Sequence, residues 1–398
     1  MAEKCDILVS GGGVAGLAAA ACFGAAGFKV ICVDPAPPVT SRDAEGSDLR
    51  TTAFLQPAQE LLAQYGLWQG LADHAAPLQI MRIVDAGGTL PQARIVKDFN
   101  ARDISDRPFG WNLPNWLLRR EFLARIEGLA NVDFRAGTGT KALFTRTGEA
   151  RVSLSDGNEV EAQLVVACDG RNSPMREAAG IPVKTTRYGQ KALAFAVTHP
   201  VPHENVSTEI HRSGGPFTLV PLPDYEGQPS SAIVWMERGA RADELLRMAP
   251  ERFEAEMTRR SCGLFGDLKL ASRRTIWPII SQSAARLDGE RLALMAEAAH
   301  VVPPIGAQGL NMSLGDLRCL LDLAAARPEG LGDAEMLSAY HKARHNEILL
   351  RIKGIDLLNR TSMLAPRPLR DLRAIGLNAL YSLAPVRRTL MQMGLGVK

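Results

Sequence analysis

Apolar residues at the start of the chain follow the pattern of a strand, a helix and a second strand. Residues 7–10 form a short apolar run, which is typical of a buried parallel strand. An Ala-rich helix is predicted over residues 14–26 and ends before Gly27. A second apolar strand, residues 28–33, leads into Asp34. This order predicts the first unit of a parallel α/β sheet.

The turn between the first strand and the helix carries glycines at the spacing GxGxxG. In such a turn the first glycine makes the sharp bend, the second lets backbone approach a diphosphate, and the third lets the helix pack closely on the strand. The diphosphate lies at the positive end of the helix, and an acid ending the second strand accepts hydrogen bonds from an adenosine ribose. The pattern predicts a dinucleotide site, FAD or NAD, formed by Gly11, Gly13, Val14, Ala15, Gly16 and Asp34.

Another strand of the same sheet is predicted in the middle of the chain. Between residues 141 and 168 apolar positions alternate around an Asp-Gly-Asn turn and close with the apolar run 164–167. Asp169 follows this run, at the carboxyl end of a strand, where ligands bind in open α/β sheets. The alternative is a simple strand-to-helix turn that Ser173 caps.

The pattern changes between residues 190 and 280. Short β-like runs separated by Pro and Gly surround one helical stretch, residues 252–260, and predict an antiparallel second lobe that roofs a pocket. The runs are residues 193–197, 217–220 and 232–236. Three histidines of this stretch lack the spacing of a site and are expected to be structural: His199, His203 and His211.

A third motif follows a buried strand predicted at residues 291–295. Two prolines stiffen the loop after it, and Gly306 and Gly309 permit backbone conformations that other residues resist. A helix predicted from Leu310 to Ala326 then points its amino terminus at the pocket. Free N–H groups and the helix dipole stabilise an anion there. This favours a flavin, because the reduced ring carries negative charge near N1 and the C2 carbonyl.

Length and composition narrow the class of protein. The 398 residues suggest two lobes, and 46% hydrophobic with 22% charged residues exclude disorder, collagen and a coiled coil. A net charge of +3 is too small for a nucleic-acid binder, although eleven Lys/Arg and only three Asp/Glu follow residue 340. Six scattered cysteines without metal-ligand spacing are expected to be buried thiols of a reduced compartment. With no signal peptide or spanning segment, we expect a cytoplasmic protein.

Taken together, the motifs resemble those of the single-component FAD-dependent aromatic monooxygenases. Residues 48–52, 298–300 and 303–311, with the C-terminal helical region, resemble the ubiquinone-biosynthesis hydroxylase branch. The resemblance implies an α/β fold in which a Rossmann-type FAD-binding domain carries an inserted antiparallel-sheet substrate domain and a C-terminal helical region. The implied division is FAD-binding domain 1–75, 101–185 and 276–330, substrate domain 76–100 and 186–275, and C-terminal helical region 331–398.

The resemblance also implies roles for single residues. From the residues alone, Arg50 is either a cofactor clamp or a surface cation; the resemblance places it, with Arg119, at the cofactor phosphates and ribityl chain. Asp169 would contact the cofactor. Pro303 would line the flavin edge, and the backbone of Gly309, Leu310 and Asn311 would hold the pyrimidine end of the ring. No catalytic base and no metal ligand can be named.

One position departs from the family pattern. The family has Gly-Asp before residues 298–300, whereas this chain has Ala296-Glu297. The family aspartate binds the ribityl hydroxyls. Glu297 keeps the charge but adds a methylene, and Ala296 adds a Cβ where backbone approaches closely. We therefore expect Glu297 to take the ribityl role with weakened FAD affinity.

The implied reaction uses NAD(P)H as a transient reductant of FAD. O2 then forms a flavin C4a-hydroperoxide, which transfers one oxygen to a small aromatic, polyprenylated substrate, while the second oxygen leaves as water. The protein orients the reactants and excludes water. Further implied partners are a ubiquinone-biosynthesis protein complex and, at the cytoplasmic face, the inner membrane. No nucleic-acid partner is expected.

The basic C-terminal tail permits two interpretations. Apolar residues recur there at near-helical spacing, at Leu369, Leu372, Ile375, Ala379, Leu380 and Leu383, and are flanked by Arg367, Arg370, Arg373, Arg387 and Arg388. Such a segment either lies on anionic lipid or packs on the second lobe with solvated arginines.

Two other functions compete with hydroxylation. An NAD-linked dehydrogenase would use the first motif alone and leaves residues 296–311 without a role. A non-catalytic prenyl-lipid-binding or assembly subunit would have kept the fold while losing flavin binding at positions 296 and 297.

Overall fold

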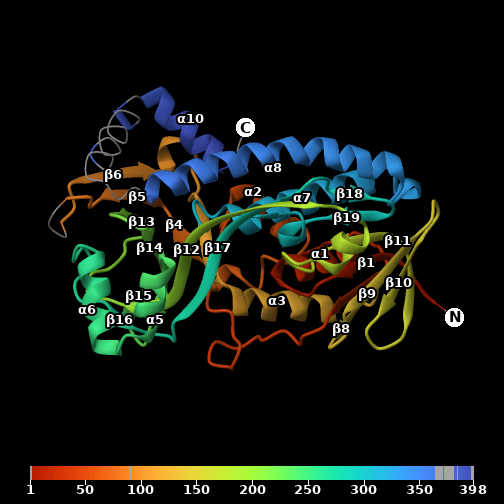
Figure 1. Cartoon of the computed structure of the whole chain (residues 1–398), viewed down its shortest axis with the longest axis horizontal. Helices are drawn as coiled ribbons and strands as arrows, with labels where there is room; N and C mark the ends of the chain where they lie inside the picture. The colour runs from red at the N-terminus through yellow and green to blue at the C-terminus, as the bar shows by residue number, and fades with distance from the viewer. Residues whose placement is uncertain (1, 89–91, 364–370, 372–380, 383, 396–398) are drawn as a thin grey trace.

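The computed structural model describes residues 2–88, 92–363, 371, 381, 382 and 384–395 (Figure 1). Two large sheets lie next to each other, and one long helix runs along both (Figure 1). This arrangement matches the predicted fold class, a Rossmann-type α/β domain with an inserted sheet domain and a helical C-terminal region.

The first sheet has eight strands and contains the predicted βαβ unit. Its main order is β18-β19-β11-β1-β2-β8, with β9 and β10 extending from β11. β1 pairs in parallel with both β11 and β2, and β10 pairs antiparallel with β9 and β11. The strands are β1 (Glu3–Ser10), β2 (Val30–Asp34), β8 (Val132–Ala136), β9 (Thr140–Thr145), β10 (Ala150–Leu154), β11 (Glu159–Ala167), β18 (Asp288–Gly289) and β19 (Leu292–Leu294).

Helices cover this sheet and share one core with it. The Ala-rich helix α1 is buried along most of its length and packs against α3 and α7, because its small side chains allow close approach. The helices of this lobe are α1 (Val14–Ala25), α2 (Gln56–Gln64), α3 (Asn115–Glu127), α4 (Pro174–Ala178) and α7 (Gln308–Ala326). The shared core includes Leu8, Phe23, Phe122, Val166 and Leu317, all fully buried.

The second sheet has nine strands in the order β20-β17-β12-β15-β14-β13-β5-β6, with β16 beside β12. All pairings are antiparallel except that of β13 with β5. The strands are β5 (Ile80–Asp85), β6 (Ile95–Asn100), β12 (Val183–Thr198), β13 (Val206–His211), β14 (Pro216–Tyr225), β15 (Gln228–Arg238), β16 (Lys269–Leu270), β17 (Thr275–Ala284) and β20 (His300–Val301). β17 belongs to this sheet because it pairs with β12 along most of its length. The expected division had instead put residues 276–330 in the FAD-binding domain.

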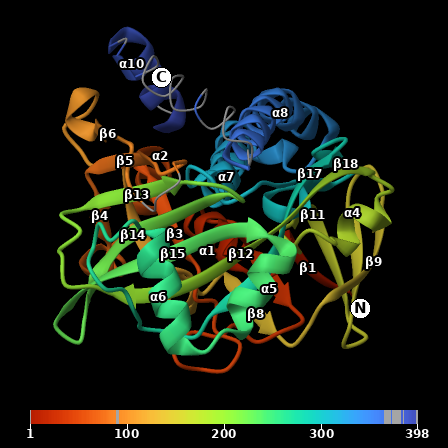
Figure 2. The ribbon, with the colours of Figure 1, turned by 60° about the vertical axis from the view of Figure 1, so that its left-hand side comes forward.

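Two helices, α5 (Gly239–Arg247) and α6 (Pro250–Arg260), lie on the outer face of the second sheet (Figure 2). They enclose a separate core around Phe195, Trp235 and Phe253. The sequence pattern predicted a helix at 252–260 and missed α5. The three histidines of this lobe have structural partners: His199 contacts Val201 and Ser231, His203 contacts Leu222, and His211 contacts Glu209.

A small antiparallel sheet connects the two lobes. Its order is β3-β7-β4, with β3 (Thr51–Leu55), β4 (Ala76–Leu78) and β7 (Gly110–Pro114). β14 of the large sheet packs against β4 and β7. Short 3-10 helices also lie in the connecting segments: η1 (Ala72–His74), η2 (Ala101–Asp103), η3 (Ala296–Ala298) and η4 (Pro328–Gly330).

The long helix α8 (Ala334–Ser362) contacts α7, β17 and β18, and thus both lobes. The C-terminal helix α10 (Ala384–Leu395) packs through Met391 on Ala101 and Phe109. No helix in the described part of the chain is both long and apolar enough to span a bilayer. The apolar tail positions 369, 372, 375, 379, 380 and 383, and the arginines at 367, 370 and 373, lie outside the described residues.

All six cysteines are free thiols. Four are buried as expected, whereas Cys262 and Cys319 are half-buried, so the expectation was wrong for these two. Burial nevertheless raises the pKa of Cys319 to about 11.

Candidate cofactor site

In the glycine turn between β1 and α1, some glycines are required by the fold and another leaves space for a ligand. Gly11 has φ +102°, and a Cβ there would lie 2.5 Å from the Cys168 carbonyl oxygen. A Cβ on Gly16 would lie 1.8 Å from the Gly11 carbonyl oxygen. A Cβ on Gly13 would meet nothing within 4 Å. The fold itself therefore requires Gly11 and Gly16, whereas Gly13 leaves the backbone open at the amino terminus of α1, as a diphosphate requires.

Asp34 lies against this turn. Its Oδ2 accepts a hydrogen bond from the Gly12 N–H at 2.6 Å, and its Oδ1 accepts from the Ala36 N–H at 2.8 Å. These contacts fix the carboxylate at the end of β2. An ionised carboxylate has about four lone-pair positions, so acceptor capacity remains on each oxygen for ribose hydroxyls.

Arg50 and Arg119, far apart in the sequence, converge on one acid. Arg50 donates to both oxygens of Asp48, from Nε at 2.8 Å and Nη2 at 2.7 Å, and Arg119 Nη2 lies 3.9 Å from Asp48 Oδ2. Asn115 adds a hydrogen bond to Asp48 at 3.0 Å. Burial opposes the charge on Asp48, but the hydrogen bonds and charge of Arg50 outweigh it and lower the pKa of Asp48.

Asp48 lies in the motif 48–52 but was predicted no role of its own, although its spacing of two residues from Arg50 is the signal of such a local pair. The Arg119 Nε is buried and has no partner in the described part of the chain. An unpaired buried cation donor of this kind fits a phosphate or hydroxyl of a bound cofactor.

The turn after β11 contains the cap that the sequence offered as one alternative, and contact of Asp169 with the cofactor stays a prediction. Ser173 caps α4 by accepting a hydrogen bond from the Arg176 N–H at 3.0 Å. Asp169 Oδ2 accepts from the Met175 N–H and from the Ser10 hydroxyl, each at 3.2 Å. Its Oδ1 is buried and has no partner among the described residues, and burial raises the pKa of Asp169. Within the described ranges no donor reaches this oxygen, so it can accept a hydrogen bond from a bound ligand.

The loop before α7 presents an uncapped helix terminus. α7 begins at Gln308, two residues before the predicted start, because Gly306 (φ +64°) and Ala307 (φ +55°) both adopt the left-handed region and turn the chain into the helix. No side chain of the described residues caps α7. The first N–H groups of the helix therefore remain for a ligand, and a Cβ on Gly309 would meet nothing within 4 Å.

Asn311 fixes this terminus to the small sheet. Its Nδ2 donates to the carbonyls of Ala53 at 2.7 Å and Ala307 at 2.6 Å, and its Oδ1 accepts from the Leu55 N–H at 2.9 Å. Leu310 is half-buried and Gly309 exposed, so backbone here is accessible. Pro303 is buried, its carbonyl accepts a hydrogen bond from the Ile305 N–H at 2.8 Å, and its place at a flavin edge stays a prediction.

The departure at Ala296 and Glu297 keeps a glycine-like backbone. Ala296 has φ +55°, a conformation that costs a residue with a Cβ about 1–2 kcal/mol. Glu297 is exposed and forms no hydrogen bond within the described part of the chain. Its charge contributes to raising the pKa of Arg50, after the hydrogen bond from Arg50 to Asp48. Glu297 thus belongs electrostatically to the cluster of Arg50.

Restoring the family pattern is expected to tighten cofactor binding. The double variant Ala296→Gly/Glu297→Asp removes the strained Cβ and shortens the acid, which should add about one hydrogen bond, or about 1 kcal/mol and roughly fivefold in FAD affinity. Titration of the apoprotein by quenching of FAD fluorescence measures this. The control variant Glu297→Gln removes the charge of this side chain at nearly constant size, and so measures how much of the FAD affinity depends on that charge. Unchanged affinity in the double variant would contradict a ribityl role for position 297.

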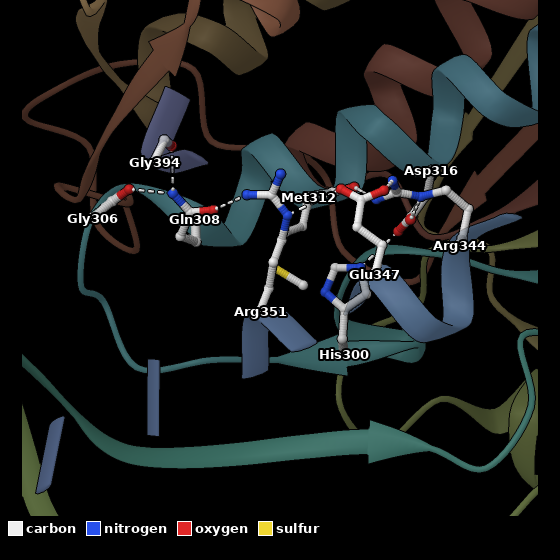
Figure 3. A network of polar contacts seen from close by, with 9 residues as sticks. All are labelled: His300, Gly306, Gln308, Met312, Asp316, Arg344, Glu347, Arg351 and Gly394. Atoms are coloured by element: carbon white, nitrogen blue, oxygen red, sulfur yellow. Dashed lines mark hydrogen bonds and ion pairs between the residues drawn. The ribbon is translucent and has the colours of Figure 1, made fainter. Parts of the chain in front are cut away.

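The residues present therefore fit a flavin dinucleotide: an open glycine turn, an acid at the ribose end, two clustered arginines, an orphaned carboxylate oxygen and an uncapped helix. Figure 3 shows a buried pair of side chains, of which the sequence motifs included only His300. His300 of β20 and Asp316 of α7, with side chains 1% and 0% exposed, are joined at 2.6 Å and connect the two elements on either side of the loop that leads to α7 (Figure 3).

Comparison with known proteins agrees with this geometry. Residues 4–349 match the FAD binding domain family. The chain is similar to the ubiquinone hydroxylase UbiL of Rhodospirillum rubrum, with 32% identity over 394 residues covering 98% of this chain and 89% of that protein. It is also similar to the 3-demethoxyubiquinol 3-hydroxylase of Escherichia coli, with 24% identity covering 99% of each chain.

Among solved structures, p-nitrophenol 4-monooxygenase PnpA from Pseudomonas putida superimposes on this chain with a TM-score of 0.80 and 19% sequence identity. The superposition covers 100% of this chain and 99% of that one, so the two proteins share the fold. The expectation of FAD as cofactor and NAD(P)H as reductant is confirmed, and an NAD-linked dehydrogenase using the first motif alone is ruled out. The chain belongs to the FAD binding domain family and is an FAD-dependent monooxygenase.

Proposed function

We propose that this enzyme hydroxylates the aromatic ring of a polyprenylated phenol in ubiquinone biosynthesis. The observation that carries the proposal is the uncapped amino terminus of α7, set by two left-handed residues beside the small sheet. Similarity to ubiquinone hydroxylases along nearly the whole chain supports the substrate class. FAD, when bound, supplies the redox and oxygen chemistry.

The protein residues hold and orient the reactants. N–H groups of residues 308–310 offer positive potential to an anion at this end of the site. Arg50 and Arg119, held by Asp48, offer cations toward phosphates. The apolar cluster of Ile305, Ile279, Met236 and Ile355 lies between this loop, the second sheet and α8, and excludes water on that side.

The experiment is reconstitution with FAD followed by NADH oxidation in the presence of a short-chain prenylated phenol. We expect substrate to accelerate NADH oxidation and to gain one oxygen by mass spectrometry, with the unprenylated phenol as a matched control. NADH oxidation that no phenol accelerates, with all O2 recovered as hydrogen peroxide, would overturn the proposal. Protein that remains flavin-free in excess FAD yet binds the phenol would favour the non-catalytic alternative.

We further propose that the enzyme works at the surface of an anionic membrane, with or without other proteins of the pathway. Support comes from α8, where three leucines are exposed: Leu350 (66%), Leu357 (67%) and Leu358 (57%). Lys342 and Lys353 are exposed on the same helix, while its carboxylates Glu335, Glu347 and Asp356 form ion pairs with arginines. Exposed apolar groups on a helix that also carries exposed lysines suit an anionic lipid surface.

Replacing Leu350, Leu357 and Leu358 together by serine is expected to lower the fraction of protein that sediments with phosphatidylglycerol vesicles several-fold. Deleting residues 367–398 should act in the same direction. The matched control replaces Val96, Phe144 and Val201, which are exposed elsewhere at 46%, 57% and 45%. Equal loss in both triple variants, or none in either, would contradict a membrane face on α8.

A further inference from the structure

A continuous ladder of polar contacts joins the buried interior to the loop before α7 (Figure 3). Asp316 accepts from His300 at 2.6 Å and from Arg344 Nε at 2.8 Å. Arg344 donates to Glu347 at 2.5 Å, and Glu347 accepts from Arg351 at 3.0 Å. On α8 these residues lie about one helical turn apart. The contacts connect α8 to α7 twice, at Asp316 through Arg344 and at Gln308 through Arg351.

The upper end of the ladder is Gln308, the first residue of α7. Its Oε1 accepts from Arg351 Nη1 at 2.8 Å. Its Nε2 donates to the carbonyls of Gly306 at 2.8 Å and Gly394 at 3.2 Å. The amide thus uses both N–H donors and one acceptor at once, and its orientation is determined by three segments of the chain.

Through Gln308, these three contacts act on the turn that leads into α7. Gly306 and Ala307 occupy the left-handed region directly before α7. Gln308 holds the carbonyl of Gly306, and Asn311 holds that of Ala307. Ile305, just before, packs on Ile355 of α8. The direction of the α7 terminus therefore depends on α8 and on the placement of α10.

We propose that Gln308 is a positioning residue, held by the Arg344–Glu347–Arg351 ladder of α8 and by Gly394 of α10, which aims the α7 terminus at the flavin. The C-terminal helix then contributes to the cofactor site through Gln308, because the Gly394 carbonyl accepts one of the two hydrogen bonds that the Gln308 amide donates. This inference rests on FAD as the cofactor and is independent of the aromatic substrate.

The test compares Arg351→Met with Arg360→Met in the full-length protein. Both arginines form an ion pair with the acid four residues earlier on α8, at 3.0 Å and 2.9 Å, but only Arg351 reaches Gln308. We expect Arg351→Met to weaken FAD binding about five- to twentyfold and to shift the midpoint potential and visible spectrum of bound flavin. Arg351→Lys should recover part of the affinity, and Arg360→Met should match the wild type.

Two further variants test the remaining contacts of Gln308. Gln308→Glu keeps the shape and the contact to Arg351 but loses both donated hydrogen bonds. Deletion of residues 394–398 removes the acceptor on α10. Each should change FAD affinity and midpoint potential in the same direction as Arg351→Met. All readouts are made without substrate, so a failed hydroxylation assay leaves them interpretable.

The outcomes separate positioning from plain structural support. If Arg351→Met and Gln308→Glu lower only the melting temperature of the apoprotein, with FAD affinity, spectrum and potential at wild-type values, the proposal is overturned. It is also overturned if Arg360→Met shifts the flavin properties as much as Arg351→Met. If only the deletion is without effect, the part of the proposal that involves α10 is wrong.

Discussion

Gly13→Ala is expected to lower FAD affinity by about 10- to 100-fold while the apoprotein keeps its wild-type stability. The added methyl group would meet no protein atom within 4 Å, and the backbone at Gly13 (φ −68°) is one that alanine adopts without strain. The methyl group would instead occupy the space that a diphosphate needs, and such overpacking costs about 1–3 kcal/mol.

Gly16→Ala should behave in the opposite way. Its methyl group would lie 1.8 Å from the Gly11 carbonyl oxygen, inside a helix that is buried along most of its length. Neither backbone can yield, so we expect the fold itself to lose about 3 kcal/mol or more, with little soluble protein.

Urea unfolding of the apoproteins and titration with FAD separate the two cases. The prediction fails if Gly13→Ala destabilises the apoprotein as much as Gly16→Ala, or if it binds FAD as tightly as the wild type. A useful control is Gly354→Ala on α8, where a Cβ also meets nothing within 4 Å, far from the glycine turn in sequence. It should leave FAD binding unchanged and slightly raise helix stability.

Asp316→Asn is expected to cost about 3–5 kcal/mol of folding free energy. Asp316 is fully buried and receives hydrogen bonds from His300 and Arg344, and Arg344 is itself buried. Burial disfavours the charge on Arg344, but Asp316 and Glu347 outweigh it and raise the pKa of Arg344. Removing the Asp316 charge alone leaves a buried guanidinium without its main counter-ion.

A double-mutant cycle tests this interpretation. Arg344→Met alone should also destabilise, because it leaves Asp316 as a buried charge with only His300 beside it. The double variant Asp316→Asn/Arg344→Met removes both charges and should recover most of the loss, giving a coupling energy of about 2 kcal/mol or more. Additive effects of the two substitutions in urea unfolding would show that the pair is not the cause.

Local patterns in the sequence were sufficient where one segment contains all the atoms involved. The βαβ unit with its glycine turn, Asp34 at the end of β2 and the cap of α4 by Ser173 each involve residues close together in the chain. Apolar runs also indicated the two lobes, because a buried strand consists mainly of apolar residues that are consecutive in the sequence. The apolar runs did not indicate α5. The division implied by the resemblance put β17 in the FAD-binding domain, whereas β17 pairs with β12 of the second sheet, and such pairing is a property of two distant segments.

Chemistry that depends on distant segments was decided by the tertiary structure. Local patterns do not place Arg119 near Asp48, Asn311 against β3, or Arg351 on Gln308, because these contacts span 71, 256 and 43 residues. Only the family resemblance brought Arg119 and Arg50 to the same site. Side chains in such contacts have no local periodicity to reveal them. The sequence by itself therefore determined which class of ligand the chain can hold, through short glycine and helix-terminus motifs. The orientation of the α7 terminus depends on contacts with α8 and α10, and these contacts exist only in the folded protein, because the segments are distant in the sequence.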